Sequence, residues 1–309
     1  MAVYTSLSQN DVRNFLDGYS IGKLIDFEGI SAGVTNSNFF INCDSGKYVL
    51  TLFEQESFED IALFSNLMSS LAKFNYPCPD PIKDKNKKII QELKNKPAII
   101  ISLVPGKITK TISVNHCKHI GEKLAELHLL TKKVKFSRKN KRDFAWIEAT
   151  FDKVKINLKQ DEKLEIEKEL LFLKENTSDQ LPQGLIHADL FHDNVLFKED
   201  GSVGGVIDFY YASIDKFIYD IAIVVNDWCV NKIGKIDLKK FNAFINAYNS
   251  VRKILPDEMQ KMNIYLRLAA MRFLISRFFD FYNQRDGEIK NVKDPHYFLN
   301  ILKNRQEGN

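Results

Sequence analysis

One short segment between two apolar runs contains most of the residues whose types could do chemistry. The segment LIHADLFHDNVLF, residues 185–197, places two histidines and two aspartates within seven positions and then adds an asparagine. Polar side chains set between apolar runs either form hydrogen-bonded structure or belong to a functional site. Three uses fit these residue types: binding a metal, transferring a phosphate, or capping a buried turn.

The spacing within this segment favours phosphate transfer. His187, Asp189 and Asn194 have the spacing of the catalytic loop in protein kinases and related enzymes. An aspartate at this position accepts or orients the proton of an attacking hydroxyl group, and the asparagine turns its amide oxygen towards Mg²⁺. A predicted hairpin then returns the chain to Asp208, whose carboxylate adds a second hard oxygen ligand for that ion.

Composition and charge argue against several other classes of protein. The net charge of +4 is small for 309 residues, whereas nucleic-acid binding usually shows as a one-sided basic excess. The four cysteines form no CxxC pair, so neither a disulfide framework nor a zinc site is expected. The N-terminus lacks the pattern of a signal peptide, and the apolar runs are too short to cross a bilayer. We expect a cytoplasmic protein that acts on a small molecule, without nucleic-acid or membrane partners; the sequence does not indicate its oligomeric state.

The elements that must position these residues fall into two blocks. Hydrophobic periodicity predicts helices over 8–15 and 57–74 and strands over 24–29, 38–43, 47–53, 89–93 and 98–103. After Pro105 it predicts a hairpin of strands 194–197 and 203–207 among helices over 113–130, 143–158, 162–174, 219–229, 238–248 and 256–282. Segregated blocks indicate an α+β fold with an N-terminal antiparallel-sheet lobe, 1–104, and a larger, mostly helical C-terminal lobe, 105–309, rather than a doubly wound sheet.

Longer stretches of the chain resemble a known family. HADLFHDNVLF followed by GVIDFYYASIDKFIYDIA resembles the homoserine kinases in the aminoglycoside phosphotransferase and choline kinase branch of the protein-kinase-like fold. MAVYT, GVTNSNF, YVLTLFE and YPCPDPI are similar to the same group, so the similarity covers nearly the whole chain. The resemblance implies a two-lobed kinase-like fold. It also implies transfer of the γ-phosphate of ATP, with Mg²⁺, to the hydroxyl of L-homoserine, giving O-phosphohomoserine in threonine biosynthesis.

The resemblance also implies a role for each residue of the motif. Asp189 would be the catalytic aspartate, and Asn194 and Asp208 would hold Mg²⁺ against the ATP phosphates. His187 would support the loop through backbone hydrogen bonds, and Asp220, in the stretch YDIA, would cap its helix and brace the same loop.

In the N-terminal lobe, the stretch GVTNSN at 33–38 lies where the family has its phosphate-binding loop. The resemblance implies that phosphate oxygens meet side chains or N–H groups of Gly33, Thr35, Asn36, Ser37 and Asn38. It also implies that the backbone from Ser102 to Val104 pairs with adenine. The loop is not glycine-rich, and without the downstream motif an ordinary polar hairpin turn would explain its composition equally well.

One position departs from the kinase pattern. Kinases usually carry a phosphate-binding lysine on the third strand, whereas YVLTLF places Thr51 there. Because a hydroxyl group cannot replace a positive charge, another cation or the metal must neutralise the α- and β-phosphates. Lys47 begins the same strand, but it is four residues away and is expected at the surface.

The residues that bind the acceptor are harder to identify. An amino-acid alcohol needs an acidic partner for its ammonium group and a cationic partner for its carboxylate. Arg272, among apolar residues of the last predicted helix, and Tyr210, two positions after Asp208, are the candidates. The simpler interpretations are an ion pair for the arginine and a core position for the tyrosine. The basic segment 132–142 is expected to be a solvated loop.

Two other functions fit parts of the motif. A metallohydrolase would use His187, Asp189, His192 and Asp193 as ligands, but the remaining histidines show no matching ligand spacing and Asp208 has no role in it. A kinase-like binding protein without catalysis would explain the missing lysine but not the intact catalytic and metal-ligand positions. Among active phosphotransferases, choline, methylthioribose and aminoglycosides are the alternative acceptors.

Overall fold

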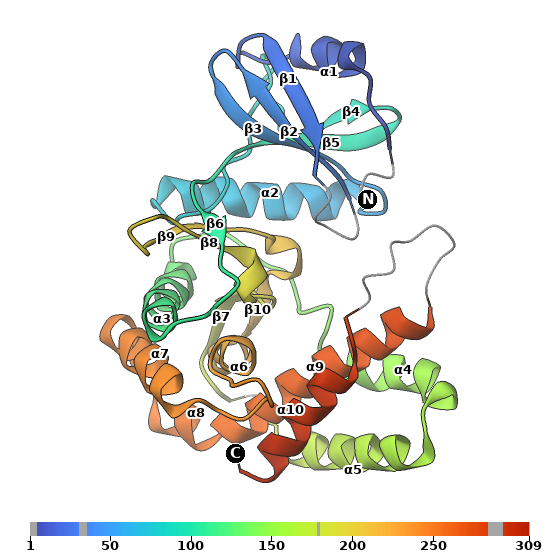
Figure 1. Cartoon of the computed structure of the whole chain (residues 1–309), viewed down its shortest axis with the longest axis vertical. Coiled ribbons are helices and arrows are strands. Elements are labelled where there is room, and N and C mark those ends of the chain that lie inside the picture. The colour runs from blue at the N-terminus through green and yellow to red at the C-terminus, as the bar shows by residue number, and fades with distance from the viewer. Residues whose placement is uncertain (1–4, 31–35, 178–179, 284–292, 309) are drawn as a thin grey trace. The chain divides into compact units, whose positions relative to one another are not determined.

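The computed structural model describes residues 5–30, 36–177, 180–283 and 293–308, and the chain forms two compact units (Figure 1). The N-terminal unit comprises Met1–Pro105 with Gly204–Tyr210, and the C-terminal unit comprises Gly106–Val203 with Tyr211–Asn309. After leaving the N-terminal unit at Pro105, the chain thus returns to it in a short segment that contains Asp208. Gly33 and Thr35, which are expected at the phosphates, lie outside the described residues.

A five-stranded antiparallel sheet forms the centre of the N-terminal unit, in the order β1-β2-β3-β5-β4. Its strands are β1 Leu24–Gly29, β2 Ser37–Cys43, β3 Gly46–Leu52, β4 Gln91–Leu93 and β5 Lys96–Ser102. Two helices accompany it, α1 Gln9–Leu16 and α2 Phe58–Lys73. Buried and more exposed residues alternate along β2, as expected for a strand with one covered face. Every strand and helix predicted for this region is present.

The core of this unit is apolar surface that α1 and the sheet bury together. Val12 and Leu16 of α1 lie in one cluster with Phe39, Ile41 and Leu50 of the sheet, and none of these side chains is more than 4% exposed. Full burial of a side chain of this kind contributes about 1.5–3 kcal/mol. The apolar face of α1 therefore explains why the chain before the first strand folds onto the sheet.

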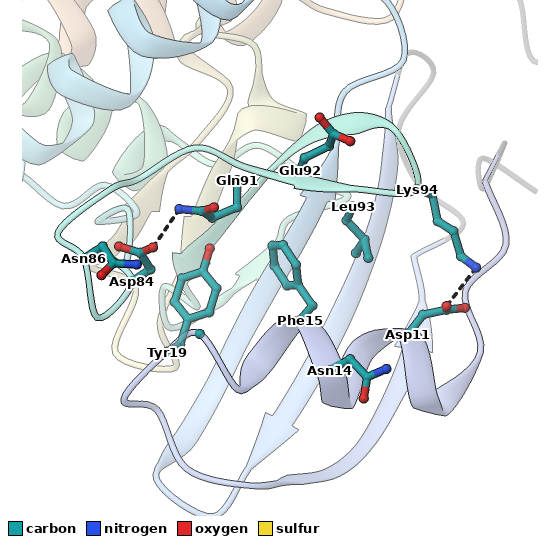
Figure 2. Close-up of a pocket in the computed structure, with 11 residues that line it drawn as sticks. Asp11, Asn14, Phe15, Tyr19, Asp84, Asn86, Gln91, Glu92, Leu93 and Lys94 are labelled. Atoms are coloured by element: carbon teal, nitrogen blue, oxygen red, sulfur yellow. Dashed lines mark hydrogen bonds and ion pairs between the residues drawn. The ribbon is translucent and has the colours of Figure 1, made fainter.

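A polar pocket of about 460 Å³ lies between α1 and the β4–β5 hairpin (Figure 2). Lys94 and Asn95 form the hairpin turn with φ of 55° and 59°, the left-handed conformation of both central residues in a type I′ turn. Lys94 pairs with Asp11 of α1 at 2.7 Å, and Gln91 donates to Asp84 at 2.7 Å. The ion pair ties the hairpin to the first helix, and none of the predicted site residues lines this pocket.

Helices dominate the C-terminal unit. They are α3 Val114–Leu130, α4 Phe144–Val154, α5 Gln160–Asn176, α6 Phe217–Trp228, α7 Leu238–Val251, α8 Pro256–Gln260, α9 Met262–Tyr282 and α10 His296–Gln306. Helix α3 packs against α7, and α9 packs against α4, α6 and α10 (Figure 1). Helix α6 is buried along nearly its whole length, so its polar side chains need partners inside the unit. None of the helices in the described ranges is long and apolar enough to cross a membrane.

Two small sheets are formed by strands that lie before or between these helices in the sequence. β7 Gln183–Ile186 pairs antiparallel with β10 Ser213–Lys216. β6 Lys107–Ile108 pairs antiparallel with β8 Val195–Phe197, and β9 Val203–Val206 completes the order β6-β8-β9. β8 and β9 form the predicted hairpin. The other three strands are absent from the prediction, because so few residues carry too little alternation to be distinguished from loops.

Two predictions about the last third of the chain need correction. The single helix predicted over 256–282 is wrong, because α8 and α9 are separated at Lys261, where φ is −90° and ψ is 0°. Glu258 of α8 is buried and paired with Arg252. Helix α8 therefore turns a charged side chain towards the interior, whereas most of the buried residues of α9 are apolar. Helix α10, which begins directly after Pro295, is missing from the prediction.

All four cysteines are free and buried. Cys43 and Cys78 lie in the N-terminal unit, and Cys117 and Cys229 lie in the C-terminal unit. Burial raises the pKa of Cys78 to about 12, and it also raises the pKa values of Cys43 and Cys229. These thiols therefore belong to the cores of the two units.

Candidate active site

The backbone of the motif turns sharply directly after β7. Ala188 has a φ of 63°, a left-handed conformation that non-glycine residues rarely adopt and that needs support from its surroundings. Asp220, in the first turn of α6, accepts the main-chain N–H of His187 at 2.8 Å and that of Ala188 at 2.9 Å. The buried His187 ring accepts the N–H of Asp189 at Nδ1, at 3.3 Å. Both residues expected to support the loop therefore bond to its backbone.

Asp220 is itself held by a polar chain through the helical core. Its carboxylate lies 3.2 Å from Nε2 of His128, whose Nδ1 lies 2.6 Å from the Tyr248 hydroxyl. Arg252 donates to that hydroxyl at 3.0 Å and pairs with Glu258. Burial lowers the pKa of His128, because desolvation outweighs the attraction of Asp220. A neutral His128 can donate to Asp220 and accept from Tyr248, which satisfies every member of the chain.

The other end of α6 holds the far side of the loop. Asp227 accepts the main-chain N–H of His192 at 2.7 Å and lies 2.8 Å from Nδ1 of the same histidine. Trp228 donates its indole N–H to the carbonyl of Leu190 at 2.9 Å. The hydrogen bond that the His192 ring donates to Asp227 raises the pKa of His192. One buried helix thus fixes the loop at both ends, and His192 serves the structure of the loop.

Asp189 carries the carboxyl group that this loop presents. Its side chain is 18% exposed, and its Oδ1 lies 3.4 Å from Nη1 of Arg272 in α9. Asn194 donates its amide to the main-chain carbonyl of Asp189 at 2.9 Å and is only 3.5 Å from its Oδ2. Burial raises the pKa of Asp189, and the attraction of Arg272 reduces that shift without cancelling it. A carboxyl group in this state is suited to accept a proton from a bound hydroxyl compound.

Asn194 and Asp208 carry the oxygen atoms expected at the metal. Because the amide nitrogen of Asn194 donates to Asp189, its Oδ1 is the atom left to face a cation. Asp208 follows β9 and has a φ of 66°, a second left-handed conformation at a non-glycine residue. Amide and carboxylate oxygens are hard donors and suit Mg²⁺. Across the described ranges no group of three or more His, Cys, Asp or Glu side chains is arranged to hold a metal.

The polar residues at the start of β2 are bonded to neighbours in the sheet. Ser37 donates its hydroxyl to Glu54 at 2.6 Å, and Asn36 accepts the N–H of Glu54 at 3.2 Å. Glu54 also pairs with Lys96 of β5. Desolvation alone would raise the pKa of Glu54, but the hydrogen bonds from Lys96 and Ser37 lower it. Asn36 and Ser37 therefore stabilise this end of the sheet, and their contact with phosphate stays a prediction.

Thr51, at the position where kinases have a lysine, has a hydrogen-bond partner of its own. Thr51 is 2% exposed and lies directly opposite Asn38 in the β2–β3 pair. Its hydroxyl donates to Oδ1 of Asn38 at 2.7 Å. A neutral pair thus occupies the place where kinases have a charged residue, so Asn38 has a structural bond as well as its predicted place at the phosphates.

The backbone at the end of β5 is hydrogen-bonded to Asp80, in the segment between α2 and β4. Ser102 donates its N–H to the carbonyl of Asp80 at 2.9 Å, and its hydroxyl accepts the N–H of Asp80 at 2.9 Å. The side chain of Val104 packs against Gly205 of β9, where an added Cβ would lie only 2.3 Å from Val104 Cγ2. The predicted pairing of residues 102–104 with adenine stays a prediction.

The two residues expected at the acceptor have different surroundings. Tyr210 packs its ring on Phe53 and Phe64 of the N-terminal unit, with centroid distances of 5.9 Å and 4.6 Å. Arg272 is 3% exposed and reaches the catalytic candidate Asp189. The structure therefore places Arg272 beside the motif and gives Tyr210 a packing contact; a role in substrate binding stays a prediction for both.

Two residues near the motif are absent from the sequence prediction. Asp227 lies seven positions after Asp220, which puts both aspartates on one face of α6, and this spacing is the signal that could have identified it. Arg142 lies at the end of the basic segment that was expected to be solvated, yet its guanidinium carbon lies 4.0 Å from the ring centroid of Trp146. A basic loop gives no local sign that one of its arginines packs on aromatic rings.

Comparisons with known proteins agree with this geometry. Residues 26–254 match the phosphotransferase enzyme family. A homoserine kinase of Methylobacillus flagellatus is 43% identical over 98% of this chain and 95% of its own length. One from Neisseria meningitidis is 37% identical over 98% of this chain and 99% of its own. The solved amicoumacin kinase has the same fold, with a TM-score of 0.73, 15% identity and coverage of 97% of this chain and 93% of that one.

The chain belongs to the phosphotransferase enzyme family. The predicted α+β, protein-kinase-like fold and the predicted enzyme class, an ATP-dependent phosphotransferase with an alcohol group as acceptor, are confirmed. Within that class, the two relatives just described, which match this chain over nearly its full length, are homoserine kinases. The resemblance read from the motifs is therefore confirmed, and so is homoserine phosphorylation as the activity that it implied.

Proposed function

We propose that the protein transfers the γ-phosphate of Mg²⁺-bound ATP to the hydroxyl group of L-homoserine, which gives O-phosphohomoserine and ADP. Residues 1–104 would bind the nucleotide, and residues 105–309 would provide the acceptor site and the catalytic residue. The observation that carries the proposal is Asp189, a partly buried carboxyl group on a loop that one buried helix fixes at both ends. A cytoplasmic setting is part of the proposal and is consistent with four free thiols.

Asp189 would act on the acceptor hydroxyl. As the hydroxyl oxygen attacks the γ-phosphorus in line with the leaving ADP oxygen, its proton would pass to the Asp189 carboxylate. The raised pKa of this carboxyl group makes it a better proton acceptor than an exposed aspartate. Because the loop is rigidly braced, positioning of the hydroxyl contributes to the rate together with proton transfer.

Asn194 and Asp208 would hold the Mg²⁺. When bound, this ion supplies positive charge that stabilises the oxygens of the transferred phosphoryl group. The chain contributes orientation, because the amide nitrogen of Asn194 is tied to the Asp189 carbonyl at 2.9 Å. Rotation of the amide would break this bond, so Oδ1 keeps its direction.

The nucleotide would be bound without the usual kinase lysine. Thr51 forms a neutral pair with Asn38, and Lys96 is paired with Glu54. We therefore expect main-chain N–H groups of the 33–38 loop to provide the donors that meet the phosphates, as backbone nests do at other anion sites. The backbone of residues 102–104 would pair with adenine.

An ADP-release assay over a panel of acceptors tests this function. The panel contains L-homoserine, choline, methylthioribose and an aminoglycoside, each assayed with ATP and Mg²⁺ and again after chelation of the metal. We expect rapid ADP release with L-homoserine, loss of that release after chelation, and O-phosphohomoserine as the product by mass spectrometry. A higher kcat/KM for another compound would replace homoserine as the acceptor. Acceptor-independent nucleotide binding without turnover would instead favour a kinase-like binding protein.

A further inference from the structure

Two arginines converge on one tyrosine ring in the C-terminal unit. Arg142 precedes α4 and Arg272 lies in α9, two helices that pack against each other (Figure 1). Their guanidinium carbons lie 5.7 Å and 5.1 Å from the ring centroid of Tyr211. Each also packs on a second ring, Arg142 on Trp146 at 4.0 Å and Arg272 on Phe273 at 3.8 Å. Cation–π contacts of this kind fix the positions of both positive charges.

These two arginines lack the close carboxylate partner that a structural arginine of the same unit has. Arg267 pairs with both oxygens of Glu169, at 2.7 Å and 2.6 Å. Arg272 has one long contact, at 3.4 Å, with the Asp189 carboxylate. Among the described residues no carboxylate lies within ion-pair distance of Arg142. Both guanidinium groups therefore keep N–H donors that a bound anion could use.

We infer that Arg142 and Arg272 form the binding site for the carboxylate of the acceptor. The inference rests on the proposed function and names its substrate class: hydroxy acids with a free carboxylate, not simple amino alcohols. Guanidinium groups bind carboxylates through paired N–H donors, and the ring of Tyr211 supplies an apolar surface for the methylene groups.

The place of Arg272 connects carboxylate binding with catalysis. L-Homoserine carries its carboxylate and its hydroxyl at opposite ends of a short chain. Arg272 contacts Asp189, so a carboxylate held by the arginine pair leaves the hydroxyl end free to reach the Asp189 carboxyl group. Within the described part of the chain Arg142 packs on Trp146 and Tyr211 and makes no ion pair with Asp189. It would therefore act on the substrate carboxylate alone, which makes it the cleaner position for a test.

A matched pair of acceptors tests the inference. L-Homoserine and 3-aminopropan-1-ol share the hydroxyl, the ammonium group and the chain between them, and differ by the carboxylate. For Arg142→Gln we expect the ratio of kcat/KM between L-homoserine and 3-aminopropan-1-ol to fall about 10- to 100-fold, the range for a lost charge-assisted bond. The change should lie mainly in KM for L-homoserine. The same ratio should fall less in Arg142→Lys, because lysine keeps the positive charge but not the paired N–H donors.

The controls separate binding from folding. Arg13→Gln removes an exposed arginine of α1 and should keep the wild-type ratio. If thermal denaturation shows that Arg142→Gln is not folded, the test is made with Arg142→Lys. Arg272→Gln should also lower the ratio, and the ratio is the proper measure there because Arg272 contacts Asp189 as well. A folded Arg142 variant with the wild-type ratio would overturn the inference.

Failure of the proposed function would have a different signature. In that case wild-type protein would release no ADP with either compound. Calorimetric titration with L-homoserine and with 4-hydroxybutanoate, which keeps the carboxylate and lacks the ammonium group, then decides. Binding that weakens at least tenfold in Arg142→Gln supports the carboxylate site. Binding that does not depend on Arg142, or no binding at all, overturns it.

Discussion

At the scale of single residues, Asp189 is the position with the most direct chemical consequence. We expect Asp189→Asn to lower kcat about 10²- to 10⁴-fold, because an amide cannot accept the hydroxyl proton. The affinity for Mg²⁺-bound ATP should stay near that of the wild type, since the shorter hydrogen bond that holds Asn194, at 2.9 Å, goes to the main-chain carbonyl of residue 189, and its contact with the carboxylate is a long one, at 3.5 Å. Steady-state kinetics and a nucleotide titration measure the two effects. Wild-type turnover would remove Asp189 from the catalytic role.

Thr51 is a structural residue at a position that is catalytic in many kinases. We expect Thr51→Val to lower the free energy of unfolding by about 1–2 kcal/mol, because the half-buried Asn38 loses its hydrogen-bond donor. Urea denaturation gives the value. Thr51→Ser keeps the hydroxyl and is the matched control; a valine variant as stable as the wild type would show that the Thr51–Asn38 bond contributes nothing.

The sequence indicated residues of the site only where the chemistry is local. Asp189 and Asn194 are five positions apart, so their spacing can be read directly. Arg142 reaches the neighbourhood of Arg272 only because α4 packs on α9, and no local pattern encodes that contact. The interpretation of Arg272 as one half of a structural ion pair is half correct, since its carboxylate partner is the catalytic candidate itself.

At the scale of elements, α6 determines the shape of the catalytic loop. Asp220→Ala would leave the N–H groups of His187 and Ala188 without an acceptor in a buried site. We expect a loss of about 3 kcal/mol in the free energy of unfolding, together with a large fall in kcat. Asp220→Asn keeps one acceptor oxygen and should lose less of both. Urea denaturation and kinetics on the same samples test this order, and equal effects of alanine and asparagine would contradict it.

The contact of α3 with α6 makes stability depend on pH. The pKa of His128 is lower in the folded protein than its ordinary value of 6.5, so the unfolded chain binds the proton more readily. The contribution of a neutral His128 is therefore complete above about pH 6.5 and is lost as the pH falls below it. Protonation would also remove the Nδ1 acceptor from Tyr248, in a chain that includes Asp220, Arg252 and Glu258.

We expect the His128→Gln variant to lose less stability on acidification than the wild type, by about 1 kcal/mol for each pH unit below that value. Urea denaturation at about pH 7.5 and pH 5.5 measures the difference, and the comparison of two proteins cancels the contributions of the other histidines. Parallel loss in both proteins would show that His128 is already protonated at neutral pH or has no part in the dependence.

Elements were predictable where their periodicity extends over several turns or strand residues. Helices α2 and α3 and the strands of the N-terminal sheet were predicted for this reason. The interruption at Lys261 was not, because apolar residues continue on both sides of it. The β7–β10 pair was not predicted either, since the catalytic loop and the β8–β9 hairpin lie between its two strands and pairing is not visible in either strand alone.

At the scale of the whole molecule, the order of strands and helices along the chain was enough to predict the fold class. A run of strands around one helix, followed by a run of helices, excludes alternating βαβ units. The return of residues 204–210 to the N-terminal unit was not predictable. It depends on tertiary packing such as the close fit of Gly205 against Val104.

Each unit contains two buried thiols, which can report how often that unit opens. A thiol reacts with an alkylating reagent as the thiolate and only when it is exposed, so Cys43 and Cys78 report openings of the N-terminal unit, and Cys117 and Cys229 report openings of the C-terminal unit. Mass spectrometry of the labelled peptides would then give separate opening rates for the two units in the unmodified protein. A bound nucleotide should slow the labelling of Cys43 and Cys78, and a bound acceptor should slow the labelling of Cys117 and Cys229.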